Sequence, residues 1–236
     1  MLREQAQKLG AELRWVDPLL APDQGGPRLG LPGEMQRANA AVAVAMARAI
    51  AERAWPRPDR PLTQAAILEG LAAARWPGRL ETRLYRGVPV LLDGAHNPPA
   101  ASVLRQELDR LGSGPRRWLI GIQRHKDAPA MLELLLAPGD QALITPIPEH
   151  RSWSRDDLAM ARPALAAQLL PVAEPLSGLE ALISDLASDH DSACDHGHDH
   201  ANDHADDRAD RLQPVVAGSL HLLGVLLPRL ALPERP

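Results

Sequence analysis

The second half of the chain alternates short, almost wholly apolar runs with longer stretches that have helical patterns. The runs expected to form strands are 88–93, 118–122, 141–146 and 213–218. The stretches expected to form helices are 98–111, 127–136, 155–168, 176–186 and 219–230. Strands that are apolar on both faces belong in a parallel sheet covered by helices on both sides. The sequence therefore predicts a small Rossmann-like α/β domain with a mostly parallel sheet and flanking helices.

The first third of the chain has a different pattern, dominated by helix. Residues 11–16 alternate weakly, as a short strand would, and a loop rich in Pro and Gly follows. The stretch 34–55 is rich in Ala and contains no Pro or Gly, so it predicts a long helix, and 63–75 predicts a second. That helix ends at Trp76-Pro77-Gly78. The Pro-Gly pair predicts a boundary between one domain at 1–76 and another at 77–236.

The net charge of −4 is unevenly distributed along the chain. Between Asp189 and Asp210 there are eight Asp and one Arg, which sum to −7 and leave +3 for all the other residues. A body charge of +3 is too weak for the dense basic stripe of a nucleic-acid interface, so no nucleic-acid partner is expected. The acidic segment is expected to be an insertion at 187–212.

The sequence carries no sign of export or of a membrane anchor. Its single cysteine, Cys194, allows no internal disulfide framework, which fits a reducing compartment. The first residues are charged where a signal peptide should be apolar. The longest apolar runs, 40–47 and 214–228, fall short of the ~18 residues of a spanning helix. We therefore expect a cytoplasmic protein with no membrane partner.

Polar residues follow two of the expected strands at the point where each strand ends. The first group is Asp93-Gly94-Ala95-His96-Asn97-Pro98, and the second is Gly218-Ser219-Leu220-His221. Ligands of an open parallel sheet bind outside the carboxyl ends of its strands, and a helix N-terminus favours an anion. Capping is the alternative for both groups, because Asp, Asn and Ser are common at turns and helix starts.

Two common catalytic loops are missing from the sequence. A Walker A phosphate loop needs Gly-Lys-Ser/Thr, but the two lysines, Lys8 and Lys126, follow Gln7 and His125. No Gly-x-Ser-x-Gly elbow occurs, so a hydrolase triad built on Ser219 is disfavoured.

Several motifs together resemble the carboxy-terminal portion of folylpolyglutamate synthase and dihydrofolate synthase, members of the Mur ligase superfamily. The matching segments, in order, are Gly33-Glu34-Met35-Gln36-Arg37-Ala38-Asn39-Ala40, Trp76-Pro77-Gly78-Arg79-Leu80-Glu81, Asp93-Gly94-Ala95-His96-Asn97-Pro98, Gly121 to Asp127, and Ala217-Gly218-Ser219-Leu220. One departure is Met35, where the family usually has His. The resemblance covers nearly the whole chain except the acidic segment. It implies that residues 1–76 are the tail of a central ATPase domain and that 77–236 form the glutamate-ligase domain.

The resemblance also implies a role for six residues. Asn39 would recognise adenine, Arg79 would contact the ATP phosphates, and Asp93 would accept from the nucleotide ribose hydroxyls. His96 and Ser219 would lie on the glutamate side, with Lys126 in the same cleft. Five of the six have a plainer alternative: a helix residue for Asn39, a surface charge for Arg79, and caps for Asp93, His96 and Ser219. The role of Lys126 stays open.

The reaction implied by the resemblance is an ATP-dependent amide ligation. The carboxylate of a folate or of dihydropteroate is phosphorylated to an acyl phosphate, which the amine of L-glutamate then attacks. The phosphate loop and the Mg²⁺ ligands of the family belong to the part of the ATPase domain that this sequence lacks. We therefore expect a truncated or split ligase that is inactive alone, with a separate chain as one possible source of the P-loop domain.

The acidic segment suggests a competing function. It contains His190, His196, His198, His200 and His204, and imidazoles at such spacing can gather Zn²⁺ or Ni²⁺. The alternative is a solvated insertion with too few apolar residues to fold. A non-catalytic Rossmann-like binding module, with metal buffering through this segment, thus stands beside the ligase hypothesis.

Overall fold

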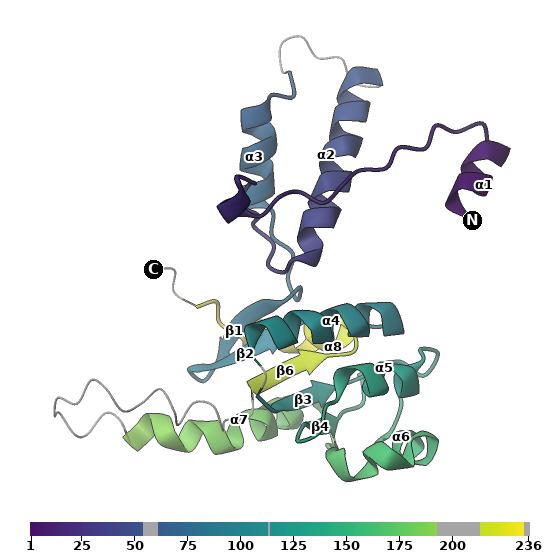
Figure 1. The fold of residues 1–236 in the computed structure, drawn as a ribbon. Helices are drawn as coiled ribbons and strands as arrows, with labels where there is room; N and C mark the ends of the chain where they lie inside the picture. Colours follow the sequence, from purple (N-terminus) through teal and green to yellow (C-terminus); the bar gives the residue numbers. More distant parts are fainter. Residues whose placement is uncertain (54–60, 113, 193–212, 234–236) are drawn as a thin grey trace. The chain divides into compact units, whose positions relative to one another are not determined.

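The computed structural model describes residues 1–53, 61–112, 114–192 and 213–233, and it divides the chain into two compact units. The first unit is Met1–Trp76 and the second is Pro77–Pro236. Figure 1 shows the first unit as helices and loops, and the second as a sheet with helices packed on it. The histidine-rich acidic segment lies outside the described residues, apart from the helical backbone that leads into it.

The first unit is built from helices. They are α1 (Leu2–Lys8), a short 3-10 turn (Pro22–Gln24), α2 (Met35–Arg53) and α3 (Gln64–Ala73). The expected helices at 34–55 and 63–75 are therefore present, and Thr63 caps α3 by accepting from the Ala66 amide. The expected strand at 11–16 is wrong. Those residues are exposed and have no regular structure, because no strand among the described residues of this unit lies beside them to share hydrogen bonds.

The second unit contains a six-stranded sheet in the order β1-β2-β6-β3-β4-β5. The strands are β1 (Glu81–Tyr85), β2 (Val88–Leu92), β3 (Arg116–Ile120), β4 (Gln141–Ile144), β5 (Leu169–Pro171) and β6 (Gln213–Ala217). Only β1 is antiparallel to its neighbour; the pairs from β2 to β5 are all parallel. The predicted Rossmann-like, mostly parallel architecture is confirmed.

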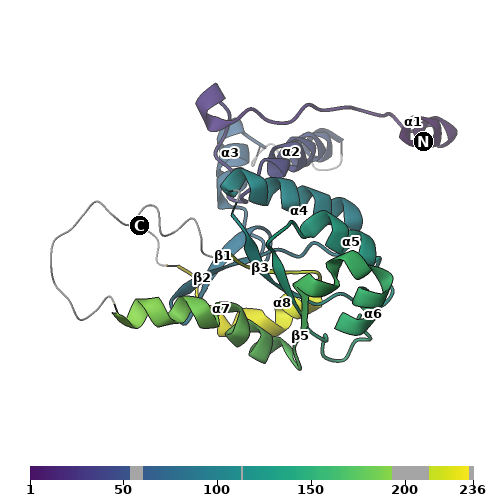
Figure 2. The same cartoon turned by 60° about the horizontal axis from the view of Figure 1, so that its bottom comes forward.

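Helices cover both faces of the sheet. They are α4 (Pro98–Leu111), α5 (Ala128–Leu135), α6 (Arg155–Ala161), α7 (Pro175–Ser192) and α8 (Leu220–Leu226). Figure 2 shows α4, α5 and α6 on one face and α7 and α8 on the other. The core on the second face joins residues of β2, β3, β4 and β6 to the apolar sides of α7 and α8. None of the helices in the described part of the chain is long and apolar enough to cross a membrane.

Several expected boundaries shift for physical reasons. The helix expected at 155–168 ends at Ala161 and continues as a 3-10 turn, Pro163–Gln168, because a proline cannot donate the hydrogen bond that would extend it. The strand expected at 118–122 begins two residues earlier, at Arg116. That arginine is fully buried, and its guanidinium donates to the carbonyls of Leu108 and Gly112.

Asp140, which directly precedes β4, forms hydrogen bonds with β3 at the amino end of the sheet. Its carboxylate is 2% exposed and accepts from the Arg116 amide at 2.8 Å, the Trp118 indole at 3.0 Å and the Ala137 amide at 3.1 Å. Arg105 adds a charged contact at 3.2 Å. The buried carboxylate is thus surrounded by donors, as a buried charge requires.

Candidate functional site

The carboxyl ends of β2 and β6 form the centre of the candidate site. These strands are neighbours, with Leu92 beside Val216. The chain leaves β2 toward α4 on one face of the sheet and leaves β6 toward α8 on the other (Figure 2). Parallel sheets bind ligands at the strand ends where loops diverge in this way. Both groups of polar residues predicted from the sequence lie at this edge.

Asp93 directly follows β2 and is 7% exposed. One carboxylate oxygen accepts from the Leu80 amide at 3.0 Å, and the other accepts from the Ala95 amide at 2.8 Å. Burial raises the pKa of Asp93, while hydrogen bonds from these two amides and the electrostatic influence of Arg79 and His96 act against the rise. Asp93 therefore connects the turn at Leu80 to the end of β2 through hydrogen bonds. Its carboxylate also interacts electrostatically with Arg79 and His96.

His96 is half-buried in the same loop. Its Nδ1 lies 2.9 Å from the carbonyl oxygen of Gly94. A carbonyl oxygen can only accept, so Nδ1 carries the proton in this contact and a neutral ring leaves Nε2 free to accept. The next residue, Asn97, caps α4 by accepting from the Ala100 amide. The loop thus combines one capping residue with one imidazole that is held in a defined tautomer.

Ser219 sits at the start of α8 and is 3% exposed. Its hydroxyl oxygen accepts from the His221 amide at 3.1 Å, so the capping role considered for it is present. The preceding Gly218 has a φ of 106°, and a Cβ there would lie 2.7 Å from the carbonyl oxygen of Gly121. The ends of β6 and β3 approach so closely that only glycine fits at this point.

Three of the motif segments pack directly against one another. The Gly94 amide donates to the Gly78 carbonyl at 2.7 Å, and a Cβ on Gly94 would lie 2.4 Å from the Leu220 side chain. A Cβ on Gly78 would likewise meet Leu223 of α8 at 2.4 Å. The turn that carries Arg79, the loop that carries His96 and the start of α8 beside Ser219 are therefore interlocked. Arg79 itself is exposed on this turn.

The two remaining predicted residues lie elsewhere. Lys126 is half-buried at the end of the loop after β3, and its backbone carbonyl accepts from the indole of Trp153 at 3.1 Å. Asn39 belongs to α2 in the first unit, is exposed, and donates through Nδ2 to Gln36 Oε1 at 3.0 Å. The structure brings Asp93, His96 and Ser219 to one sheet edge and places Lys126 on an adjoining loop, but it does not place Asn39 relative to them.

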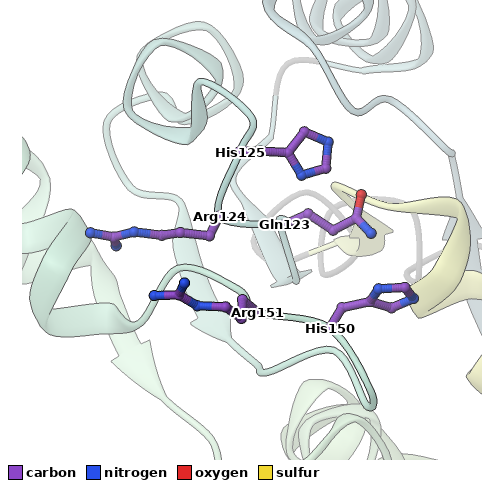
Figure 3. Close-up of a pocket in the computed structure, with 5 residues that line it drawn as sticks. All are labelled: Gln123, Arg124, His125, His150 and Arg151. Carbon is purple, nitrogen blue, oxygen red and sulfur yellow. The ribbon is translucent and has the colours of Figure 1, made fainter.

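A pocket that the sequence analysis missed lies beside this edge. Its volume is about 390 Å³, and it is lined by Gln123, Arg124, His125, His150 and Arg151 (Figure 3). The first three residues follow β3 and the last two follow β4. Polar residues also follow the third and fourth strands in the sequence, which was a partial signal. The pattern alone did not reveal that their loops meet.

No group of three or more His, Cys, Asp or Glu side chains in the described ranges is arranged to hold a metal ion. The sheet edge offers hydrogen-bond donors, cations and one buried carboxylate. Such a set can orient carboxylates and phosphates, but it does not supply the cluster of oxygen ligands that a divalent cation such as Mg²⁺ needs.

The comparisons with known proteins agree with the fold and with the motifs. The family "Dihydrofolate synthetase, C-terminal domain" matches residues 79–229. Folylpolyglutamate synthase of Lacticaseibacillus casei is 36% identical over 138 residues, which are 57% of this chain and 31% of that protein. Dihydrofolate synthetase of Saccharomyces cerevisiae is 30% identical over 162 residues, covering 61% of this chain and 37% of that protein.

Solved structures of related enzymes share the fold. Mycobacterium tuberculosis folylpolyglutamate synthase, solved with ADP and AMPPCP, has a TM-score of 0.66 at 24% identity and covers 89% of this chain and 43% of its own. The bifunctional Yersinia pestis enzyme, solved with AMPPNP and a manganese ion, has a TM-score of 0.64 at 22% identity. The match covers 96% of this chain and 50% of the Yersinia chain. The chain thus spans about a third of the curated relatives and about half of the solved chains. It belongs to the dihydrofolate synthetase family, of which it carries the carboxy-terminal domain.

Proposed function

We propose that this chain is the glutamate-side portion of an ATP-dependent ligase that adds L-glutamate to tetrahydrofolate or dihydropteroate through an acyl phosphate. The observation that carries the proposal is the interlocked edge of the sheet, where the Arg79 turn, the Asp93–His96 loop and the Ser219 turn pack together. Family membership supports the reaction class. The nucleotides bound in the Mycobacterium and Yersinia enzymes support ATP as the phosphoryl donor.

Each side chain at this edge has a task in the proposed reaction. The exposed guanidinium of Arg79 would bind the phosphates of ATP, because its planar fork suits oxyanions. Asp93 would keep that turn in place and, with the remaining lone pairs of its oxygens, accept from ribose hydroxyls. The free Nε2 of His96 would accept from the ammonium group of glutamate, while the hydroxyl of Ser219 and the ammonium of Lys126 would bind its carboxylates.

The adenine site, the phosphate loop and the Mg²⁺ ligands of the proposed enzyme would not belong to the second unit. Asn39 would recognise adenine from α2, which we infer to belong to the tail of the ATPase domain at 1–76. The first unit supports this inference because its buried apolar residues, within the described ranges, are only Ala40, Ala41 and Ile67. When bound, Mg²⁺ would neutralise charge on the transferring phosphoryl group. Its ligands, like the phosphate loop, would come from the missing amino-terminal part.

The experiment compares this chain alone with a fusion that places the amino-terminal part of the Lacticaseibacillus casei enzyme before it. Incorporation of labelled L-glutamate into tetrahydrofolate and into dihydropteroate is measured with ATP and Mg²⁺. We expect incorporation by the fusion, a loss of at least tenfold in its His96→Ala variant, and none by the chain alone. Turnover by the chain alone would refute the truncation. A folded fusion that binds ATP but transfers no glutamate to either acceptor would refute the ligase function.

A further inference from the structure

The pocket between the loops after β3 and β4 is a second candidate binding site, separate from the six residues considered above. Figure 3 shows Gln123, His125 and His150 pointing to one side, and Arg124 and Arg151 pointing to the other. The pocket adjoins the start of α8, because Nε2 of His150 lies 3.1 Å from Nδ1 of His221. It is therefore next to the Ser219 turn but not part of it.

The lining of this pocket suits an anion. It consists of two arginines, two histidines and a glutamine, with no acidic residue among them. Arg124 is held in place by an ion pair with Asp157 at 2.7 Å and lies over the Trp153 ring at 4.0 Å. The exposed Arg151 side chain makes no hydrogen bond or ion pair with any residue that the structure describes. Arg151 is thus the cation that remains available to a ligand.

Backbone hydrogen bonds between the two loops preorganise the pocket. The Arg124 amide donates to the Arg151 carbonyl at 2.8 Å, and Gln123 pairs with Ser152 in an isolated bridge. The Trp153 amide donates to the Ile122 carbonyl at 3.0 Å. These bonds join the two loops along their length. A ligand that enters such a preformed site loses little binding free energy to loop ordering.

Carboxylates are anions that match these donors. An arginine fork binds a carboxylate through two parallel hydrogen bonds, and glutamine and histidine can donate to a second carboxylate on the opposite side. A volume of about 390 Å³ is enough for more than one such group. The volume, together with donors on opposite sides, suggests a molecule with several carboxylates rather than a single small ion.

We propose that this pocket binds the carboxylates of a γ-linked glutamyl chain, with Arg151 as its main charged contact. The proposal rests on the proposed function, in which each reaction cycle adds one glutamate and therefore one more carboxylate to the acceptor. The pocket would hold glutamyl residues already present, while Ser219 and His96 face the incoming amino acid. It would thereby favour acceptors that already carry a glutamyl chain.

The test is a binding measurement on this chain, so its result does not depend on turnover. Calorimetric titrations use γ-linked triglutamate, L-glutamate and inorganic phosphate as separate ligands. The variants are Arg151→Gln and, as the matched control, Arg229→Gln, which removes an exposed arginine outside the pocket. We expect triglutamate to bind wild type at least tenfold more tightly than it binds Arg151→Gln, and the Arg229→Gln variant to bind like wild type.

Nuclear magnetic resonance locates the ligand in the same samples. The indole N–H of Trp153, which lies under Arg124, should shift on adding triglutamate, whereas the buried indole N–H of Trp118 should not. Equal affinity of wild type and Arg151→Gln, or an unmoved Trp153 signal at saturation, would overturn the proposal. So would L-glutamate or phosphate binding as tightly as triglutamate, because a single small anion would then satisfy the pocket.

Discussion

Gly218 lies where the ends of β6 and β3 approach closely. A Cβ at this position would lie 2.7 Å from the Gly121 carbonyl oxygen and 2.9 Å from Ile122, and φ is already 106°. We therefore expect Gly218→Ala to destabilise the protein by more than ~2 kcal/mol, through both the clash and the backbone strain. Urea unfolding monitored by circular dichroism measures the loss.

Gly224 provides the control for that change. It lies inside α8, and a Cβ there would meet nothing within 4 Å. Because alanine favours helix over glycine by ~0.5–1 kcal/mol, Gly224→Ala should stabilise the protein slightly. Equal unfolding midpoints for Gly218→Ala and wild type would contradict the close approach of β6 and β3.

The free energy of unfolding should depend on pH through Asp93, and the burial of this carboxyl group determines the direction of the change. Because burial raises its pKa in the folded state, the folded protein holds this proton to higher pH than the unfolded chain. The contribution of Asp93 to stability is therefore largest below the ordinary value of 3.8 and falls as pH rises through the folded-state pKa. Asn does not titrate, so an Asp93→Asn variant lacks this dependence.

The same variant also loses one hydrogen bond at every pH, because an Asn side chain has one acceptor oxygen for the two amides of Leu80 and Ala95. We expect Asp93→Asn to cost about 1–3 kcal/mol near pH 4.5, with the gap to wild type narrowing toward pH 7.5. Urea unfolding across this range measures the gap. Asp156→Asn, at a carboxylate whose side chain is 88% exposed, is the control. A stability difference between wild type and Asp93→Asn that widens as pH rises would contradict a raised pKa of Asp93.

Among the elements, both ends of α4 were predicted correctly, because residues next to each end carry the signal. Asn97 caps its start, Pro98 occupies the first turn, and Gly112 follows its end, so the chain itself carries both boundaries. By contrast β1 was not predicted. It is a polar strand that pairs with β2 and, through Leu84, forms an isolated bridge with Ala231. Its one signal was the Arg86-Gly87 turn, where both residues have positive φ. Tertiary pairing, which the local pattern does not contain, decides such strands.

The cap of α4 can be tested directly. Asn97 Oδ1 accepts from the Ala100 amide at 2.9 Å, so Asn97→Ala should cost ~1 kcal/mol of unfolding free energy. Asn97→Asp keeps the acceptor oxygen and adds a negative charge at the helix N-terminus. The helix dipole interacts favourably with a negative charge at that end. We expect the Asp variant to be as stable as wild type in thermal unfolding. If both variants lost the same stability, the side-chain cap would not be the cause.

For the molecule as a whole, the sequence predicted the sheet edge that holds Asp93, His96 and Ser219, because a parallel sheet gathers polar residues at the carboxyl ends of its strands. It could not predict the pocket around Arg151. That pocket exists because the loop after β4 folds back on the loop after β3, through the bridge between Gln123 and Ser152. A contact between loops far apart in the chain leaves no periodic pattern in either one.

The two units differ in how much apolar surface they bury, and this difference predicts which of them folds alone. The second unit has one apolar core that joins β2, β3, β4 and β6 to α7 and α8, and the family match at 79–229 lies within it. The first unit leaves Val42, Met46 and Ile50, a stripe at four-residue spacing on α2, about half exposed. A unit of this size with so small a core cannot offset its loss of conformational entropy.

We therefore expect residues 77–236, expressed separately, to unfold in urea in one cooperative transition with the midpoint of the second unit in the full chain. Residues 1–76 should unfold without a cooperative transition. Circular dichroism measures both fragments, and tryptophan fluorescence, from the fully buried Trp118 and from Trp153, reports on the larger one. A gradual transition for 77–236, or a sharp one for 1–76, would contradict this division of stability. If residues 1–76 are the tail of an ATPase domain, as proposed above, adding the amino-terminal part of the Lacticaseibacillus casei enzyme in trans should make their unfolding cooperative, because the stripe on α2 would then be covered.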